Sequence, residues 1–186
     1  MPFNHFDHVA GIYSRAAFTL SEKITQLLDL SPDANLLDIG GGTGRVAAAL
    51  RGISGPAVVA DPSRKMLQYA RHKELPTVCT PAETLPFPSN SFDRIIMVDA
   101  FHHVYNQDLT ARELWRVLKP GGKMLIIEPD IQKSIVKLIA VMERILLMRS
   151  RILSAENIQA LFREKMAHTT YSKEYPNILV LVEKVR

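Results

Sequence analysis

Residues 36–45 read Leu-Leu-Asp-Ile-Gly-Gly-Gly-Thr-Gly-Arg. In this 186-residue chain, this segment is the strongest indication of the fold. An apolar run ends in a loop with four glycines, and a helical pattern containing Val46, Ala47 and Leu50 follows. Glycines here let the backbone turn sharply and let a ligand approach the main chain closely. We therefore expect a strand, a ligand-binding loop and a helix, in that order.

Short β-rich runs alternate with helical patterns along the rest of the chain, which is the signature of βαβ units around a parallel sheet. The expected strands cover residues 35–39, 57–60, 77–79, 94–98, 123–127 and 178–185. Helices are expected from Ala17 to Leu28 and over residues 46–50, 65–72, 109–118 and 155–165. Ser63 and Asp108 are the expected caps of the third and fourth of these helices.

The composition fits one globular domain, because 47% of the residues are hydrophobic and 23% are charged. The single cysteine, Cys79, excludes an internal disulfide, and no Cys and His spacing resembles a zinc site. The first residues lack the pattern of a secretory signal, so we expect a cytoplasmic protein. The net charge of +4 is spread over the chain and is weak support for a nucleic-acid partner.

The residue types in and around the glycine loop indicate which kind of nucleotide-type ligand it binds. A dinucleotide fingerprint needs glycine at its sixth position, where this chain has Arg45, and a phosphate-binding P-loop needs a lysine that is absent. Asp38 stands at the carboxyl edge of the strand, where its carboxylate can meet a cationic amino group. Asp61 closes the second strand, where an acidic side chain can accept hydrogen bonds from two ribose hydroxyls.

Further motifs follow the glycine loop in order. They are Asp61-x-Ser63-x-x-Met66-Leu67, Ala82-Glu83-Thr84-Leu85-Pro86-Phe87, Ser91-Phe92-Asp93 and Leu118-Lys119-Pro120-Gly121-Gly122, with Phe6-Asp7-x-Val9-Ala10-x-x-Tyr13 near the start. With these motifs the chain resembles the class I S-adenosylmethionine-dependent methyltransferases, in the group that includes the ubiquinone and menaquinone C-methyltransferases.

The resemblance implies an α/β, Rossmann-like three-layer sandwich with a seven-stranded, mostly parallel sheet and an antiparallel last strand. It implies one methyltransferase domain over residues 1–186, with residues 1–30 as a helical segment over the cofactor and 131–165 as a helical substrate or lid region. The cofactor is then S-adenosyl-L-methionine, with S-adenosyl-L-homocysteine as product. The expected cofactor-binding residues are Tyr13, Asp38, Ile39, Gly40, Gly41, Gly42, Gly44, Asp61, Pro62, Met66, Ala82, Glu83, Asp99 and Phe101.

One departure from the family concerns the adenine side of the site. Members often have Gly-Asp-Ala-Glu after the third strand, whereas this chain has Thr80-Pro81-Ala82-Glu83. The hydrogen bond from the adenine amino group to that aspartate is lost, which costs about 0.5 to 1.5 kcal/mol. Pro81 also motivates an alternative in which the chain is a non-catalytic binding module or partner subunit.

His102 and His103 follow the fourth strand, at the carboxyl edge where ligands of open α/β folds collect. A neutral imidazole can remove a phenol or enol proton near neutral pH, so both are candidate catalytic bases. The competing interpretation gives them only structural hydrogen bonds.

The expected substrate is a small-molecule acceptor, hydrophobic and quinone-like, and not nucleic acid. The Asn-Pro-Pro-Tyr motif of base-modifying amino methyltransferases is absent, and we expect Cys79 to be buried and inert. Basic residues alternate with a broad apolar face over 133–153, which fits an ordinary packed helix, a lid over a lipophilic substrate, or a peripheral membrane contact. A nicotinamide oxidoreductase is disfavoured by Arg45, and the oligomeric state stays open.

Overall fold

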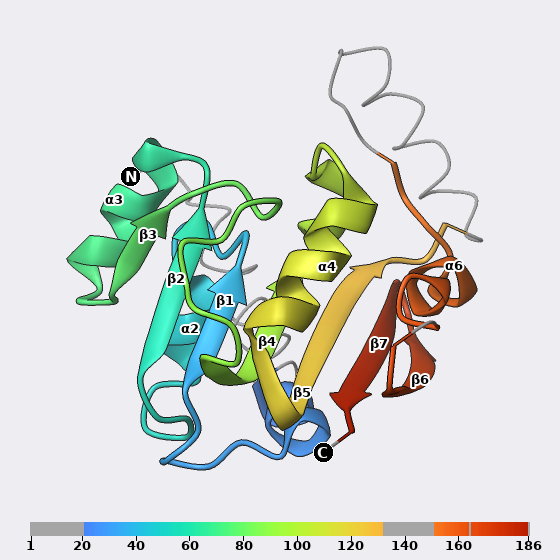
Figure 1. Cartoon of the computed structure of the whole chain (residues 1–186). Coiled ribbons are helices and arrows are strands. Elements are labelled where there is room, and N and C mark those ends of the chain that lie inside the picture. Colours follow the sequence, from blue (N-terminus) through green and yellow to red (C-terminus); the bar gives the residue numbers. More distant parts are fainter. Residues whose placement is uncertain (1–20, 132–150, 164, 186) are drawn as a thin grey trace, which may run out of the picture.

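The computed structural model describes residues 21–131, 151–163 and 165–185, which form a seven-stranded sheet with helices on both faces (Figure 1). The strand order is β3-β2-β1-β4-β5-β7-β6. The strands are β1 (Leu36–Ile39), β2 (Ala57–Asp61), β3 (Thr77–Cys79), β4 (Phe92–Val98), β5 (Leu118–Pro129), β6 (Ala167–Glu174) and β7 (Asn177–Lys184). Strands β1 to β5 pair in parallel and β7 runs antiparallel to both β5 and β6, which confirms the expected class of sheet.

The helices divide between the two faces of this sheet. They are residues 21–28, α2 (Arg45–Ala49), α3 (Arg64–His72), η1 (Phe101–His103), α4 (Gln107–Val117) and α6 (Ala155–Ala160). Buried residues of α4 and α6 share one apolar cluster with the sheet, and residues 21–28 share another with α2. Figure 1 shows α4 in front of the strands and α2 behind them. The helices therefore cover the sheet as the two outer layers of a sandwich.

The strands direct alternate side chains to the two faces because successive Cβ atoms of a strand point in opposite directions. In β1, Leu37 and Ile39 join the cluster beneath α4, whereas Leu36 joins the cluster beneath α2. In β4, Ile95 faces α4 and Ile96 faces the other side. All five side chains are at most 1% exposed, so the central strands are buried on both faces.

The carboxyl ends of the parallel strands meet at one edge of the sheet. Ile39 at the end of β1 lies beside Ala60 in β2, and Asp38 lies beside Ile96 in β4. The glycine loop, Asp61 and Asp99 therefore emerge side by side, although they are far apart in the sequence. In open α/β sheets this edge is where ligands bind.

Two expectations about local structure are corrected. Ser63 caps α3 as expected, since its hydroxyl accepts the Met66 backbone N–H at 3.3 Å. Asp108 does not cap α4: the helix begins at Gln107, two residues before its expected start at Leu109, and the Asn106 side chain accepts the Leu109 N–H at 3.0 Å. Asp108 lies in the first turn instead. Cys79 is exposed rather than buried, because β3 is one of the two edge strands of the sheet.

Several expectations concern residues outside those that the structure describes. They include Tyr13, most of the segment 1–30, and residues 132–150 of the expected substrate region. Residues 155–160 of that region are helical, but α6 stops before the expected end at residue 165. Within the described part of the chain, no helix has the length and apolar character required to cross a membrane.

Candidate functional site

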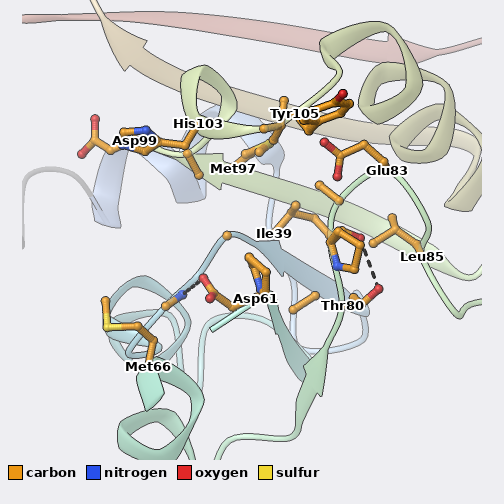
Figure 2. A pocket seen from close by; sticks show the side chains of 18 residues that line it. Ile39, Asp61, Met66, Thr80, Glu83, Leu85, Met97, Asp99, His103 and Tyr105 are labelled. Carbon is orange, nitrogen blue, oxygen red and sulfur yellow. Dashed lines mark hydrogen bonds between the residues drawn. The ribbon is translucent and has the colours of Figure 1, made fainter. Parts of the chain in front are cut away.

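A cavity of about 470 Å³ opens at the carboxyl edge of the sheet, within the size range of small-molecule sites. Figure 2 shows Asp61 and Met66 on one side of it, and Met97, His103 and Tyr105 on the opposite side. The lining residues come from the ends of β1, β2, β3 and β4 and from the segments that follow them. They are Ile39, Gly40, Gly42, Ala60, Asp61, Pro62, Met66, Thr80, Pro81, Ala82, Glu83, Leu85, Met97, Asp99, Ala100, His103, Val104 and Tyr105.

Asp61 connects the glycine loop to the start of α3. Its Oδ2 accepts the backbone N–H of Gly42 at 3.0 Å, and its Oδ1 accepts that of Ser63 at 2.7 Å. The carboxylate is 8% exposed and lines the cavity. Each carboxylate oxygen can accept a second hydrogen bond, so Asp61 keeps capacity for a ligand hydroxyl while it holds the loop.

Gly42 presents bare backbone to the cavity beside Asp61. Its φ of +53° lies in the left-handed region, which side chains other than glycine rarely adopt. A Cβ at this position would come within 3.3 Å of the Met66 Cε and 3.9 Å of the Asp61 Oδ2. The absence of a side chain therefore keeps the space between these two lining residues open.

Gly41 and Gly44 of the same loop do not line the cavity, although both were expected to bind the cofactor. A Cβ on Gly41 would lie 2.6 Å from the Asp38 carboxylate, and one on Gly44 would lie 2.5 Å from Leu75. Their role in this structure is to admit neighbouring side chains to the loop and the core.

Asp38 lies beneath the loop rather than on the cavity wall. Its side chain is 1% exposed and its Oδ2 has no hydrogen-bond partner among the described residues. Burial raises the pKa of Asp38 to about 7, against the lowering effects of the Ala47 backbone hydrogen bond and of Arg45. The expected contact between Asp38 and a cationic amino group stays a prediction.

The segment after β3 forms the wall around Pro81. The Thr80 N–H donates to the Asp61 carbonyl at 3.2 Å, and the Thr80 hydroxyl donates to the Thr84 carbonyl at 2.8 Å. The Glu83 carboxylate accepts the Asn106 N–H at 3.0 Å, which links this wall to the start of α4. Pro81 thus sits in a loop that is held at both ends, and it lines the cavity together with Ala82 and Glu83.

Asp99 begins the opposite wall, at the point where β4 ends. Its φ of +51° is unusual for a residue with a side chain, and such conformations concentrate at functional sites. Desolvation and the nearby Glu128 carboxylate raise the pKa of Asp99, while His102 and Arg45 oppose that shift. Ala100, His103, Val104 and Tyr105 continue this wall.

The two adjacent histidines have different environments. His102 is 5% exposed, does not line the cavity, and places its Nδ1 2.5 Å from the Glu128 Oε2. His103 is exposed and lines the cavity, and Figure 2 shows its ring next to Asp99. The ring centroids of the two histidines are 3.9 Å apart. His103 is therefore the histidine with access to a bound molecule.

The structure brings together ten of the residues that the sequence indicated, and adds others. The ten that line the cavity are Ile39, Gly40, Gly42, Asp61, Pro62, Met66, Ala82, Glu83, Asp99 and His103. Phe101 and His102, which were also expected, are buried behind the wall. Sequence reasoning missed several lining residues, each within seven residues of a strand end that it had located: Ala60, Thr80, Leu85, Met97, Ala100, Val104 and Tyr105.

Among the described residues, no group of three or more His, Cys, Asp or Glu side chains is arranged to hold a metal ion. The cavity combines apolar side chains, three carboxylates and one imidazole. This set can accept hydrogen bonds from hydroxyl and amino groups and can bury a planar apolar body.

Comparison with known proteins shows which proteins this chain resembles. Residues 37–126 match the family described as "Methyltransferase domain". The ubiquinone/menaquinone biosynthesis C-methyltransferase of Hahella chejuensis is 37% identical over 142 residues, which are 66% of this chain and 57% of that protein. The chain thus spans little more than half the length of this relative.

Solved structures agree on the fold. The YcgJ protein of Bacillus subtilis has a TM-score of 0.79 at 19% identity, over 92% of this chain and 99% of its own. A chain from the complex between the Haloferax volcanii Trm112 methyltransferase activator and a methyltransferase has a TM-score of 0.80 at 18% identity, with both chains fully covered. The seven-stranded architecture is therefore that of known Rossmann-like proteins.

Proposed function

We propose that this chain, whose residues 37–126 match a methyltransferase domain, transfers a methyl group from S-adenosylmethionine to a small, uncharged, hydrophobic acceptor. The observation that carries the proposal is the hydrogen bond between Asp61 and Gly42 in the wall of a cavity of suitable size. This hydrogen bond places an acidic side chain next to a stretch of backbone without a side chain in the cavity wall.

The residues present fit this cofactor. The Asp61 carboxylate retains acceptor capacity toward the cavity and would hold the ribose hydroxyls, while the bare backbone at Gly42 would lie against the nucleoside. Pro62, Met66, Ala82 and Leu85 provide apolar surface for the adenine ring. When bound, the cofactor supplies an electrophilic methyl group on a sulfonium.

The chain's own contribution to the reaction is then to position the acceptor and exclude water. His103 lies on the wall opposite Asp61 and would take the proton of a phenol or enol hydroxyl as the acceptor becomes nucleophilic. Asp99 next to it would favour the protonated imidazole that results. His102 does not take part directly, since its ring is buried against Glu128.

The walls of the cavity support an uncharged acceptor. Among the described lining residues, no Lys or Arg is present to pair with a carboxylate or phosphate, and Leu85, Met97, Val104 and Tyr105 are apolar or aromatic. The curated relatives named ubiquinone/menaquinone C-methyltransferases support a quinone-like ring in particular. We therefore propose a hydroquinone as the acceptor class.

Transfer of labelled methyl groups from S-adenosylmethionine to a short-chain prenylated hydroquinone tests this function. A ring of the same size that carries carboxylate groups serves as the matched control acceptor. We expect labelled product from the hydroquinone alone, and His103→Gln should lower its formation at least about tenfold while cofactor affinity is kept. Preference for the carboxylated ring would refute the proposed acceptor class.

A non-catalytic role as a partner subunit is the second candidate, motivated by Pro81 in the cavity wall and by the activator complex among the similar structures. Calorimetric titration with S-adenosylhomocysteine separates the two functions. Heat and thermal stabilisation are expected for the enzyme, whereas their absence would favour the partner role.

A further inference from the structure

Glu128 is a buried carboxylate with an unusual concentration of hydrogen-bond donors. It stands near the end of β5, is 1% exposed, and does not line the cavity. Its Oε1 accepts the backbone N–H groups of Ala100 and Phe101 at 3.0 and 2.8 Å. Its Oε2 accepts the backbone N–H of His102 at 3.2 Å and lies 2.5 Å from the His102 Nδ1.

These four contacts all involve one short segment, residues 100–103, which follows β4 and contains η1. Burying a carboxylate is costly unless hydrogen bonds compensate, and here the donors are supplied by that single segment. The contacts therefore fasten the end of β5 to the segment that forms the wall opposite Asp61.

One side of this segment faces the cavity and the glycine loop. Ala100 and His103 line the cavity. Ala100 also packs so closely on the loop that a Cβ on Gly40 would lie 2.5 Å from the Ala100 Cβ. A displacement of the segment would therefore change both the acceptor wall and the space available to the loop.

Residues of the same segment are also hydrogen-bonded, directly and through Gln107, to the backbone of Arg151. The Arg151 N–H donates to the His102 carbonyl at 2.9 Å. The Gln107 side-chain amide donates to the Phe101 carbonyl at 3.2 Å and to the Arg151 carbonyl at 2.8 Å. The region that leads into α6 is thus attached to the same few residues that form the cavity wall.

We propose that Glu128 is a positioning residue for methyl transfer, which acts through residues 100–103 to set the wall that carries His103 against the cofactor loop. This inference rests on the proposed function. Glu128 itself does not touch the cavity, so its effect is transmitted by the backbone hydrogen bonds and by His102.

The test compares Glu128→Gln with a variant that loses stability elsewhere. Val182 is fully buried in β7 and does not line the cavity, so Val182→Ala is the matched control. Affinity for S-adenosylhomocysteine is measured by calorimetry at a temperature where both variants remain folded. We expect at least about tenfold weaker binding for Glu128→Gln, and wild-type binding for Val182→Ala.

Two variants at His102 keep the test decisive should Glu128→Gln fold poorly. His102→Asn retains a side-chain nitrogen near the Nδ1 position and should bind nearly as the wild type, whereas His102→Leu should weaken binding. Ring ¹⁵N chemical shifts of His102 supply a second signature, because the Nδ1 shift should change on Glu128→Gln and stay constant in Val182→Ala.

Equal affinities of the wild type and Glu128→Gln, or equal losses in Glu128→Gln and Val182→Ala, would overturn the inference and leave the proposed function intact. Equal binding by His102→Leu and His102→Asn would also overturn it. Failure of the wild-type protein to bind S-adenosylhomocysteine would instead overturn the proposed function, and this inference with it.

Discussion

The Asp61 Oδ2 accepts the Gly42 backbone N–H at 3.0 Å, across 19 residues of sequence. This bond closes the glycine loop of β1 onto the end of β2 and places a carboxylate at the cavity wall. The same side chain also accepts the Ser63 N–H, so it orients the start of α3. One acidic residue therefore links the loop, the sheet and a helix at the proposed cofactor site.

Replacement of Asp61 by Asn should weaken binding of S-adenosylhomocysteine at least about tenfold, because an amide cannot accept with both terminal atoms. One of the Gly42 and Ser63 N–H groups would then face a donor. Asp33→Asn is the control, since Asp33 is exposed and does not line the cavity. Calorimetric affinities that are equal for the two variants would contradict the role assigned to Asp61.

Gly42→Ala should reduce both stability and binding, whereas Gly52→Ala should reduce stability alone. Both glycines have positive φ, +53° and +82°, and an alanine in that conformation costs about 1–2 kcal/mol. A Cβ on Gly42 would crowd Met66, but one on Gly52 would meet nothing within 4 Å. Chemical denaturation and calorimetry measure the two effects separately, and a binding loss in Gly52→Ala would show that strain alone explains the result.

Local sequence signals predicted where the strands end and that Asp61 lies at the end of a strand. A glycine-rich loop and an acidic residue after an apolar run each indicate a local backbone conformation directly. The cap at Ser63 followed from the same reasoning and is confirmed. The prediction that Asp108 caps α4 was wrong because Asn106, two residues earlier, is also a residue type favoured at the N-cap. The periodicity of apolar residues does not define the first helical residue that closely.

Longer-range arrangements were beyond sequence reasoning. The separation of His102 from His103 depends on Glu128, which lies 26 residues from His102 and carries no motif. Cys79 was wrong as a buried residue because its exposure follows from the position of β3 at the sheet edge, which depends on the strand order. Contacts that the fold creates between distant segments decided both outcomes.

Asp38 should make the protein less stable as the pH rises. Its pKa is about 7 in the folded protein, against an ordinary value of 3.8, so the folded state retains a proton that the unfolded chain has released. The free energy of unfolding attributable to this group therefore falls between pH 3.8 and about 7 and stays low above that range. Asp38→Asn removes this titration and should flatten the decline, as measured by urea denaturation at a series of pH values. Parallel stability curves for the two proteins would contradict the assignment.

Arg116 should stabilise the wall that contains Leu85. Its guanidinium donates to the carbonyls of Leu85 and Phe87 at 3.0 and 2.7 Å and pairs with Glu113, whose carboxylate accepts the Leu85 N–H at 2.8 Å. Arg116→Met keeps the apolar stem but removes these bonds, and should destabilise the protein by about 1–3 kcal/mol. Arg112→Met, at an exposed position of α4, is the control.

The pH dependence of this loss gives a sharper check on the Arg116 prediction. The hydrogen bond with Arg116 lowers the pKa of Glu113 from its ordinary value of 4.5. A carboxyl with a lowered pKa in the folded state contributes stability above its ordinary pKa and loses that contribution as the pH falls through the folded-state value. The stability difference between the wild type and Arg116→Met, measured by urea denaturation, should therefore shrink in acid. If this stability difference stays constant from pH 7 to well below 4.5, the ion pair with Glu113 does not contribute, and Arg116 stabilises the protein only through its hydrogen bonds to the backbone carbonyls.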